Sequence, residues 1–169
     1  MSYDVVFDAC TLILLAKAGL LESFLSVSKI HAAVPREVAR EACEEKQSVD
    51  SLVIQKLIDE KRINVEPLPN RLLFDRMRRE LGLGLGEAEA IALAVAKKAR
   101  LVATDDRNAV NACKFLNMPF VTALGILTRM YQQGVLDQQD AISKLAMLEK
   151  AGRYKKNILS TVRSQLGVK

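Results

Sequence analysis

The sequence predicts an α/β protein with a Rossmann-like arrangement, in which a short, mainly parallel sheet lies between layers of helices. Short apolar runs that fit strands alternate with longer runs at helical spacing from residue 5 to residue 121. Some of the short runs are apolar throughout, as in strands that are covered on both faces. No repeat or linker divides the chain, and its 169 residues suffice for one domain with its own core.

The first half of the chain shows this alternation clearly. Residues 5–7 predict a buried strand, and residues 12–21 are apolar enough for a buried helix after it. Residues 29–34 resemble a second strand, and Pro35 suits the first turn of a helix that would continue to residue 46. Ser48 is placed to cap a further helix. Its core-facing positions would be Leu52, Ile54, Leu57 and Ile58.

The second half continues the pattern. Residues 63–67 predict an edge strand, because Pro67 would disturb a central one. A basic helix over 71–80 and a small, apolar, largely buried helix from residue 87 through 96 come next. Residues 101–104 and 120–121 predict strands on either side of a helix over 107–116. Helices are expected over 123–133, 138–150 and 154–166.

The net charge of +5 is unevenly distributed along the chain. From Ala141 onward the net charge is +6, so the preceding residues sum to −1. We therefore divide the chain into a domain over residues 1–136 and a basic helical extension over 137–169 that packs on it. A basic end suits a polyanion such as RNA, although a solvated helix face has the same composition.

Histidine and cysteine usage excludes several classes of site. His31 is the only histidine, which rules out zinc sites with several imidazoles and disfavours a Ser-His-Asp triad. Three cysteines without a CxxC pair argue against a disulfide framework and a zinc knuckle. No apolar run approaches the roughly 20 residues that cross a bilayer, so we expect a soluble cytoplasmic protein with no membrane contact.

Carboxylates follow two of the predicted strands. Asp8 comes directly after residues 5–7, and Asp105 and Asp106 follow residues 101–104. If these strands are neighbours in the sheet, Asp8 and Asp105 meet where ligands bind in open α/β sheets. Two adjacent carboxylates need a countercharge, and hard cations such as Mg²⁺ or Mn²⁺ provide it. The alternative is that the aspartates only cap the helices that follow.

Glutamates on two helices extend this acidic set, since the pairs Glu37 and Glu41, and Glu87 and Glu89, occupy early helical positions. Their alternative roles are a solvated face and complementing a helix dipole. The nearby glycines do not have dinucleotide-loop spacing. A phosphoaspartate phosphatase would need an aspartate where Cys10 stands, and a receiver domain would place its paired acids near the first strand. Metal-assisted phosphodiester hydrolysis is the chemistry that remains.

The chain resembles the PIN-domain family, metal-dependent nucleases that include the toxins of many prokaryotic toxin-antitoxin pairs. The matching segments are VVFDACTLILLAKAGLL, VPREVAREA, LGLGEAEAIALA, LVATDDRNA and ALGILTRMYQQGVL. The tail KLAMLEKAGRYKKNIL is similar to the C-terminal helices of one branch. Together these segments span most of the chain.

The resemblance implies a PIN-like sheet with acids around one or two Mg²⁺ or Mn²⁺ ions, cutting single-stranded RNA. The matching catalytic and metal-binding positions are Asp8, Glu41, Glu87 and Asp105, with Asp106 as an auxiliary ligand or cap. Glu37 and Glu89 are the alternatives to Glu41 and Glu87. Many family members have Ser or Thr at the position of Cys10, and Thr11 is placed to compensate.

The leading hypothesis is a metal-dependent endoribonuclease, a hydrolase that acts as the toxin of a toxin-antitoxin pair. The expected partners are RNA, a small antitoxin protein and a second copy of the chain in a homodimer. The alternative is a non-catalytic PIN-like protein that binds RNA or another protein.

Overall fold

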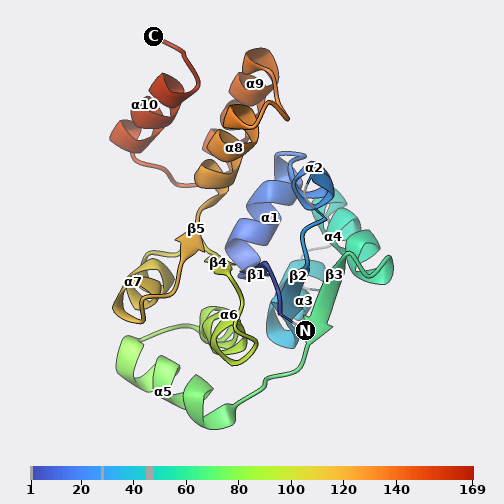
Figure 1. Cartoon of the computed structure of the whole chain (residues 1–169), viewed down its shortest axis with the longest axis vertical. Helices are drawn as coiled ribbons and strands as arrows, with labels where there is room; N and C mark the ends of the chain where they lie inside the picture. Colours follow the sequence, from blue (N-terminus) through green and yellow to red (C-terminus); the bar gives the residue numbers. More distant parts are fainter. Residues whose placement is uncertain (1, 28, 45–47) are drawn as a thin grey trace.

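The computed structural model describes residues 2–27, 29–44 and 48–169. Within these residues the core is one sheet of parallel strands in the order β3-β2-β1-β4-β5 (Figure 1). The strands are β1 (Val5–Phe7), β2 (Ala32–Pro35), β3 (Ile63–Glu66), β4 (Leu101–Ala103) and β5 (Phe120–Val121). The chain builds outward from β1 to β3, then returns to place β4 on the other side of β1. This confirms the predicted α/β fold and puts the switch in strand order between β1 and β4.

Helices connect the strands and continue beyond β5. Those before β5 are α1 (Ala9–Lys17), α2 (Leu21–Val27), α3 (Arg36–Cys43), α4 (Val49–Asp59), α5 (Arg71–Leu81), α6 (Leu85–Ala96) and α7 (Arg107–Phe115). Those after β5 are α8 (Ala123–Gln132), α9 (Gln138–Ala151) and α10 (Lys156–Gln165). In Figure 1, α8, α9 and α10 group together on the side of the sheet that α1 also covers.

Two apolar cores cover the two faces of the sheet, because alternate strand residues point to opposite faces. Val5 and Phe7 of β1 belong to the core that contains α1, α4 and the C-terminal helices, whereas Val6 belongs to the core with α5, α6 and α7. Leu148 of α9 and Leu159 of α10 are buried in the first of these cores. The C-terminal helices therefore share a core with β1.

The apolar stretch after β1 differs from its predicted single helix over residues 12–21. The structure contains two helices there, α1 and α2, which meet at a bend of 101°. Gly19 lies between them with a φ of +66°, a left-handed conformation that ends α-helices and that glycine adopts without steric penalty. Because the chain turns at Gly19, α2 packs against α1 and Phe24 meets Phe7 edge to face at 6.2 Å.

Two further predictions near α3 and α4 were wrong in detail. Pro35 ends β2 and precedes α3 as its N-cap instead of lying in its first turn, and the predicted end of that helix at residue 46 lies outside the described residues. Ser48 does cap α4, but Leu52 is 70% exposed. Two residues turn a helix by about 200°, so Leu52 and the buried Ile54 lie on nearly opposite sides. Other predicted elements are present with slightly shifted ends.

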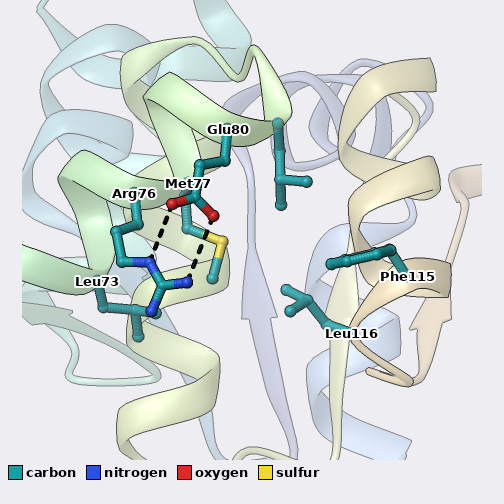
Figure 2. A pocket seen from close by; sticks show the side chains of 7 residues that line it. Leu73, Arg76, Met77, Glu80, Phe115 and Leu116 are labelled. Atoms are coloured by element: carbon teal, nitrogen blue, oxygen red, sulfur yellow. Dashed lines mark hydrogen bonds and ion pairs between the residues drawn. The ribbon is translucent and has the colours of Figure 1, made fainter.

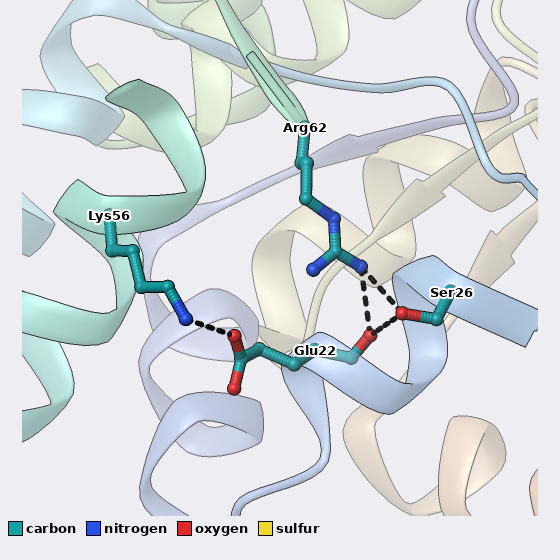
Figure 3. Close-up of polar contacts among 4 residues, drawn as sticks. All are labelled: Glu22, Ser26, Lys56 and Arg62. Carbon is teal, nitrogen blue, oxygen red and sulfur yellow. Dashed lines mark hydrogen bonds and ion pairs between the residues drawn. The ribbon is translucent and has the colours of Figure 1, made fainter. Parts of the chain in front are cut away.

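Polar contacts on the surface join α2 to α4 and to the turn before β3 (Figure 3). The Lys56 ammonium lies 3.0 Å from the Glu22 carboxylate. The Arg62 guanidinium donates to the Glu22 carbonyl at 3.1 Å and to the Ser26 hydroxyl at 2.7 Å. Because these groups are exposed, we assign them little stabilising free energy and regard the buried contacts as the main support of the fold.

No single helix in the described part of the chain is long and apolar enough to cross a membrane. Only α1 and α2 taken together reach that length and composition, across their sharp bend.

Two leucines of α4 provide a matched test of this packing. Leu57 is fully buried and Leu52 is 70% exposed. We expect Leu57→Ala to lower the free energy of unfolding by roughly 2–5 kcal/mol, because it removes buried methyl groups and leaves a cavity. Leu52→Ala should change it by less than about 0.5 kcal/mol. Urea denaturation of both variants measures the difference, and equal losses would contradict the orientation of α4.

Candidate active site at the carboxyl edge of the sheet

Asp8 and Asp105 lie side by side because β1 and β4 are parallel neighbours. Phe7 pairs with Ala103 in the register of the two strands, and the Asp8 N–H donates to the Ala103 carbonyl at 3.0 Å. Asp8 follows Phe7 directly, and Asp105 comes two residues after Ala103. The strand order changes here, so both aspartates stand at the position where open α/β sheets bind ligands.

Asp8 is a buried carboxyl that is held by donors from both sides. Its side chain is 2% exposed, and Oδ1 accepts the Thr11 N–H at 2.9 Å while Oδ2 accepts the Thr104 hydroxyl. Burial raises the pKa of Asp8 to about 7, the hydrogen bonds from Thr104 and Thr11 oppose this shift, and the neighbouring charge of Asp105 adds to it. Asp8 does cap α1, but its burial beside another carboxylate exceeds what a cap requires.

Asp105 is half-buried and accepts hydrogen bonds from three elements. Its Oδ2 accepts the Thr11 hydroxyl at 2.6 Å and the Ala123 N–H at 3.0 Å, and its Oδ1 accepts the Tyr154 hydroxyl at 3.4 Å. Burial raises the pKa of Asp105, and these donors act in the opposite direction. Thr11 therefore bridges the two acids, with its N–H on Asp8 and its hydroxyl on Asp105.

Asp106 has a different role from its neighbour. Its Oδ1 accepts the Ala109 N–H at 2.8 Å, which makes Asp106 the N-cap of α7. The cap that the sequence suggested is thus present. Its own N–H donates to the Thr104 hydroxyl at 3.2 Å, so the turn that carries Asp105 is tied to the residue that contacts Asp8.

The glutamates form a second group around α3 and α6. The Glu37 N–H donates to Glu89 Oε2 at 3.2 Å. Burial, followed by the charge of Glu37, raises the pKa of Glu89, whereas a hydrogen bond from Arg40 lowers the pKa of Glu37. The structure thus brings together Glu37 and Glu89, the two positions that the sequence had ranked as alternatives.

Glu41 and Glu87 lie elsewhere on the same two helices. A methyl group added at Gly86 would stand 3.4 Å from Glu41 Oε2, so Glu41 packs against the first turn of α6. The Glu87 carboxylate folds back over Gly84, the residue before its own helix. Within the described ranges, no three His, Cys, Asp or Glu side chains are grouped closely enough to hold a metal ion. Glu41 and Glu87 therefore do not join Asp8 and Asp105 in one cluster.

The cavities are lined by other residues. A hollow of about 140 Å³ lies between α5 and α7, walled by apolar side chains such as Leu73, Met77 and Phe115 beside the Arg76–Glu80 ion pair (Figure 2). A larger one of about 530 Å³ is lined by residues around the starts of β1 and β4. None of the candidate acids lines either hollow.

A comparison with protein families shows which family the chain belongs to. The family DUF3368, described as a PIN domain, matches residues 4–167. The chain belongs to the PIN-domain family. The match covers nearly the whole chain, including α9 and α10, and PIN domains are generally nucleases. The chain matches none of the curated proteins and none of the solved structures with which it was compared.

The residues at the candidate site fit a divalent cation in their chemistry. Asp8, Asp105, Thr11 and Thr104 present oxygen atoms, which Mg²⁺ and Mn²⁺ prefer. Mg²⁺ is commonly held by one or two carboxylates together with water and substrate phosphate, and the candidate site offers two carboxylates. The raised pKa of Asp8 is the expected state of a buried carboxyl that lacks a countercharge.

Sequence reasoning missed three donors to the PIN aspartates. Thr104 precedes Asp105 directly, and a hydroxyl between two acidic positions at a strand end was a usable signal. Ala123 contributes only a backbone N–H, and Tyr154 is 49 residues from Asp105 along the chain. Neither leaves a pattern in the sequence, because Ala123 reaches Asp105 through the pairing of β5 with β4 and Tyr154 reaches it from the turn between α9 and α10.

The pKa of Asp8 predicts how stability depends on pH. Asp8 titrates near 3.8 in an unfolded chain and near 7 in the folded PIN domain, so the folded state holds this proton more tightly. The free energy of unfolding of the metal-free protein therefore falls as pH rises from about 4 to about 7. Asp8→Asn removes this titration and should be more stable than wild type above pH 7, by roughly 2–4 kcal/mol.

Urea denaturation at about pH 5 and pH 7.5 with a chelator present tests this prediction. The stability gap between Asp8→Asn and wild type should widen from the lower to the higher pH. The same pH dependence in both proteins would show that Asp8 is already ionised in the folded state.

Proposed function

We propose that this PIN domain is a metal-dependent endoribonuclease that hydrolyses phosphodiester bonds in single-stranded RNA. The observation that supports this most directly is the pair of adjacent aspartates at the switch point of a PIN fold, of which Asp8 is buried and Asp105 half-buried. Perturbed, adjacent carboxyl groups at a ligand-binding edge are typical of catalytic sites. Structural acids on a protein surface seldom combine these features.

Asp8 and Asp105 would hold the Mg²⁺ or Mn²⁺ ion. When bound, the cation supplies Lewis acidity for the attack of water on a phosphodiester. The chain's own residues provide positioning, because Thr11 and Thr104 fix the directions of both carboxylates. Ala123, at the start of α8, holds Asp105 from the opposite side. The aspartates are thereby preorganised, which limits their rearrangement during the reaction.

The proposed partners extend this function. A ribonuclease that acts as a toxin needs a small antitoxin protein, and a second copy of the chain would form a homodimer. Partly exposed apolar side chains are available for such contacts on α9 and α10. They include Ile142, Met147 and Ile158, each 41–45% exposed.

The second candidate is a non-catalytic PIN protein that binds RNA or another protein. It is favoured by one observation, that Glu41 and Glu87 do not join the aspartate pair in the described residues. A titration with Mn²⁺ separates the two candidates. The enzyme cleaves RNA only when Mn²⁺ is added, whereas the binding protein leaves the RNA intact at every concentration of the ion.

Removing either aspartate charge tests the nuclease directly. We expect Asp8→Asn and Asp105→Asn to reduce Mn²⁺-dependent cleavage of a labelled single-stranded RNA to background, because each removes a charged ligand from a two-carboxylate site. Asp137→Asn is a matched control, since Asp137 caps α9 at an exposed position. This variant should cleave the RNA like wild type. If both site variants cleave as fast as the control, the proposed site is wrong.

A second series of variants compares the contributions of the four glutamates to cleavage. If the contact of Glu37 with Glu89 supports the metal ligands, we expect Glu37→Gln and Glu89→Gln to lower the cleavage rate by about 10–100-fold. Glu41→Gln and Glu87→Gln should lower it less if the Glu37–Glu89 contact supports the metal ligands. Single-turnover rates at saturating Mn²⁺ provide the measurement. The reverse order would favour the assignment that the sequence alone preferred.

A further inference from the structure

The turn between α9 and α10 reaches the candidate site. We call residues 152–156, with the sequence Gly-Arg-Tyr-Lys-Lys, the α9–α10 link. Its Tyr154 is partly buried, and its hydroxyl donates to Asp105 Oδ1 at 3.4 Å. Asp105 also accepts the N–H of Ala123 at the start of α8, so the link lies where α8 begins. The C-terminal extension thus contributes a side chain to the aspartate pair.

The backbone of the link permits this placement of Tyr154. A methyl group added at Gly152 would stand 2.5 Å from Cε2 and 3.0 Å from Cζ of the Tyr154 ring, and 3.1 Å from the Leu148 carbonyl oxygen. Any larger residue at position 152 would therefore push the ring or the end of α9 away. The close packing fixes the link against α9, which is itself buried in the main core through Leu148.

Three cations flank the tyrosine. Arg153, Lys155 and Lys156 are exposed, and in the described part of the chain their side chains form no hydrogen bond or ion pair. Consecutive Cα atoms are about 3.8 Å apart, so these residues are anchored near Asp105 through Tyr154. Arg163, a cation of α10, is by contrast neutralised by a 2.8 Å ion pair with Glu149.

The position of the lysines is unfavourable for the folded chain alone. Lys155 precedes α10 as its N-cap, Lys156 is the first helical residue, and the first turn contains no acidic residue. The N-terminus of a helix carries partial positive charge, so cations there destabilise it. In contrast, α7 and α9 have acidic N-caps, Asp106 and Asp137, which complement the partial positive charge of the helix N-terminus. A local conflict of this kind is expected where a residue serves binding more than stability.

We propose that the α9–α10 link binds the phosphate backbone of the single-stranded RNA and lays the strand across Asp8 and Asp105. This inference rests on the proposed function and assigns the substrate-contacting residues within it. Tyr154 places the link, and Arg153, Lys155 and Lys156 neutralise phosphates next to the one that is cleaved. The link thereby offsets the repulsion between the polyanion and the acids of the site.

An acidic protein segment is the other polyanion that lysines attract. RNA is favoured because the cations adjoin acids suited to phosphodiester chemistry, where a substrate phosphate must come close to two carboxylates. An acidic protein segment bound there would bring further carboxylates close to Asp8 and Asp105, and these like charges would repel one another. Binding to RNA therefore provides the test.

The experiment compares two charge-matched double variants of the full chain. Lys155→Gln/Lys156→Gln removes two of the three positive charges of the link, and Lys17→Gln/Lys114→Gln removes the same charge from the last turns of α1 and α7. These turns are remote from the acids, because Asp8 and Asp106 cap the opposite ends of those helices. Fluorescence anisotropy with a labelled single-stranded RNA, without divalent ions, measures Kd at several salt concentrations.

We expect the link variant to bind at least about tenfold more weakly at low salt. The negative slope of its log affinity against log salt should decrease in magnitude by about 1.4, or 0.7 for each lost contact. The control should keep the slope of wild type. In cleavage assays with Mn²⁺, the link variant should raise KM more than it lowers kcat, because the lysines act in binding. Equal affinities and slopes for the link variant and wild type would overturn the inference.

The outcomes also separate this inference from the nuclease itself. If wild type cleaves RNA and the link variant does so with the same KM, the inference fails and the nuclease stands. If wild type binds RNA through the two lysines but does not cleave it in Mn²⁺, the inference stands and the nuclease fails.

Discussion

The pairing of β1 with β4 is the constraint on which the rest of this site depends. It places two carboxylates, from positions 8 and 105, at one edge of the sheet, where Thr11 contacts both. Each aspartate also begins or ends an element, since Asp8 caps α1 and Asp105 anchors the start of α8. The acids are therefore held by the same hydrogen bonds that define the fold, and their directions are fixed before any ligand binds.

This arrangement has an electrostatic cost in the isolated chain. Burial raises the pKa values of both aspartates, the charge of Asp105 adds to the shift of Asp8, and the hydroxyl and amide donors offset only part of these effects. A protein selected for stability alone would place uncharged side chains here. The exposed lysines at the start of α10 also destabilise the isolated chain, because they place positive charge at the N-terminus of a helix. An acidic edge beside a basic link is consistent with a site that receives both a divalent cation and a polyanion.

Much of the fold was predictable because its signals are local. The short apolar runs around Val6 and Val102 identified the buried strands, and Asp106 identified the start of α7. The errors also have local causes. Gly19 divides the apolar stretch after β1 into two helices, and Leu52 shares apolar character with Ile54 but not its side of α4. Hydropathy alone does not distinguish a continuous helix from two helices that pack on each other.

The sequence by itself determined which residues carry charge at strand ends, and hence that Asp8 and Asp105 stand at one edge of a parallel sheet. It also ranked Glu41 and Glu87 above their neighbours. Only the tertiary structure decided that Glu37 meets Glu89, and that Tyr154 reaches Asp105 from the C-terminal extension. Strand positions follow from hydrophobic patterning, which the sequence records, whereas the pairing of β1 with β4 was a condition that the structure supplied. Contacts between helices depend on how whole surfaces pack, and this is set by the three-dimensional arrangement of side chains from distant segments.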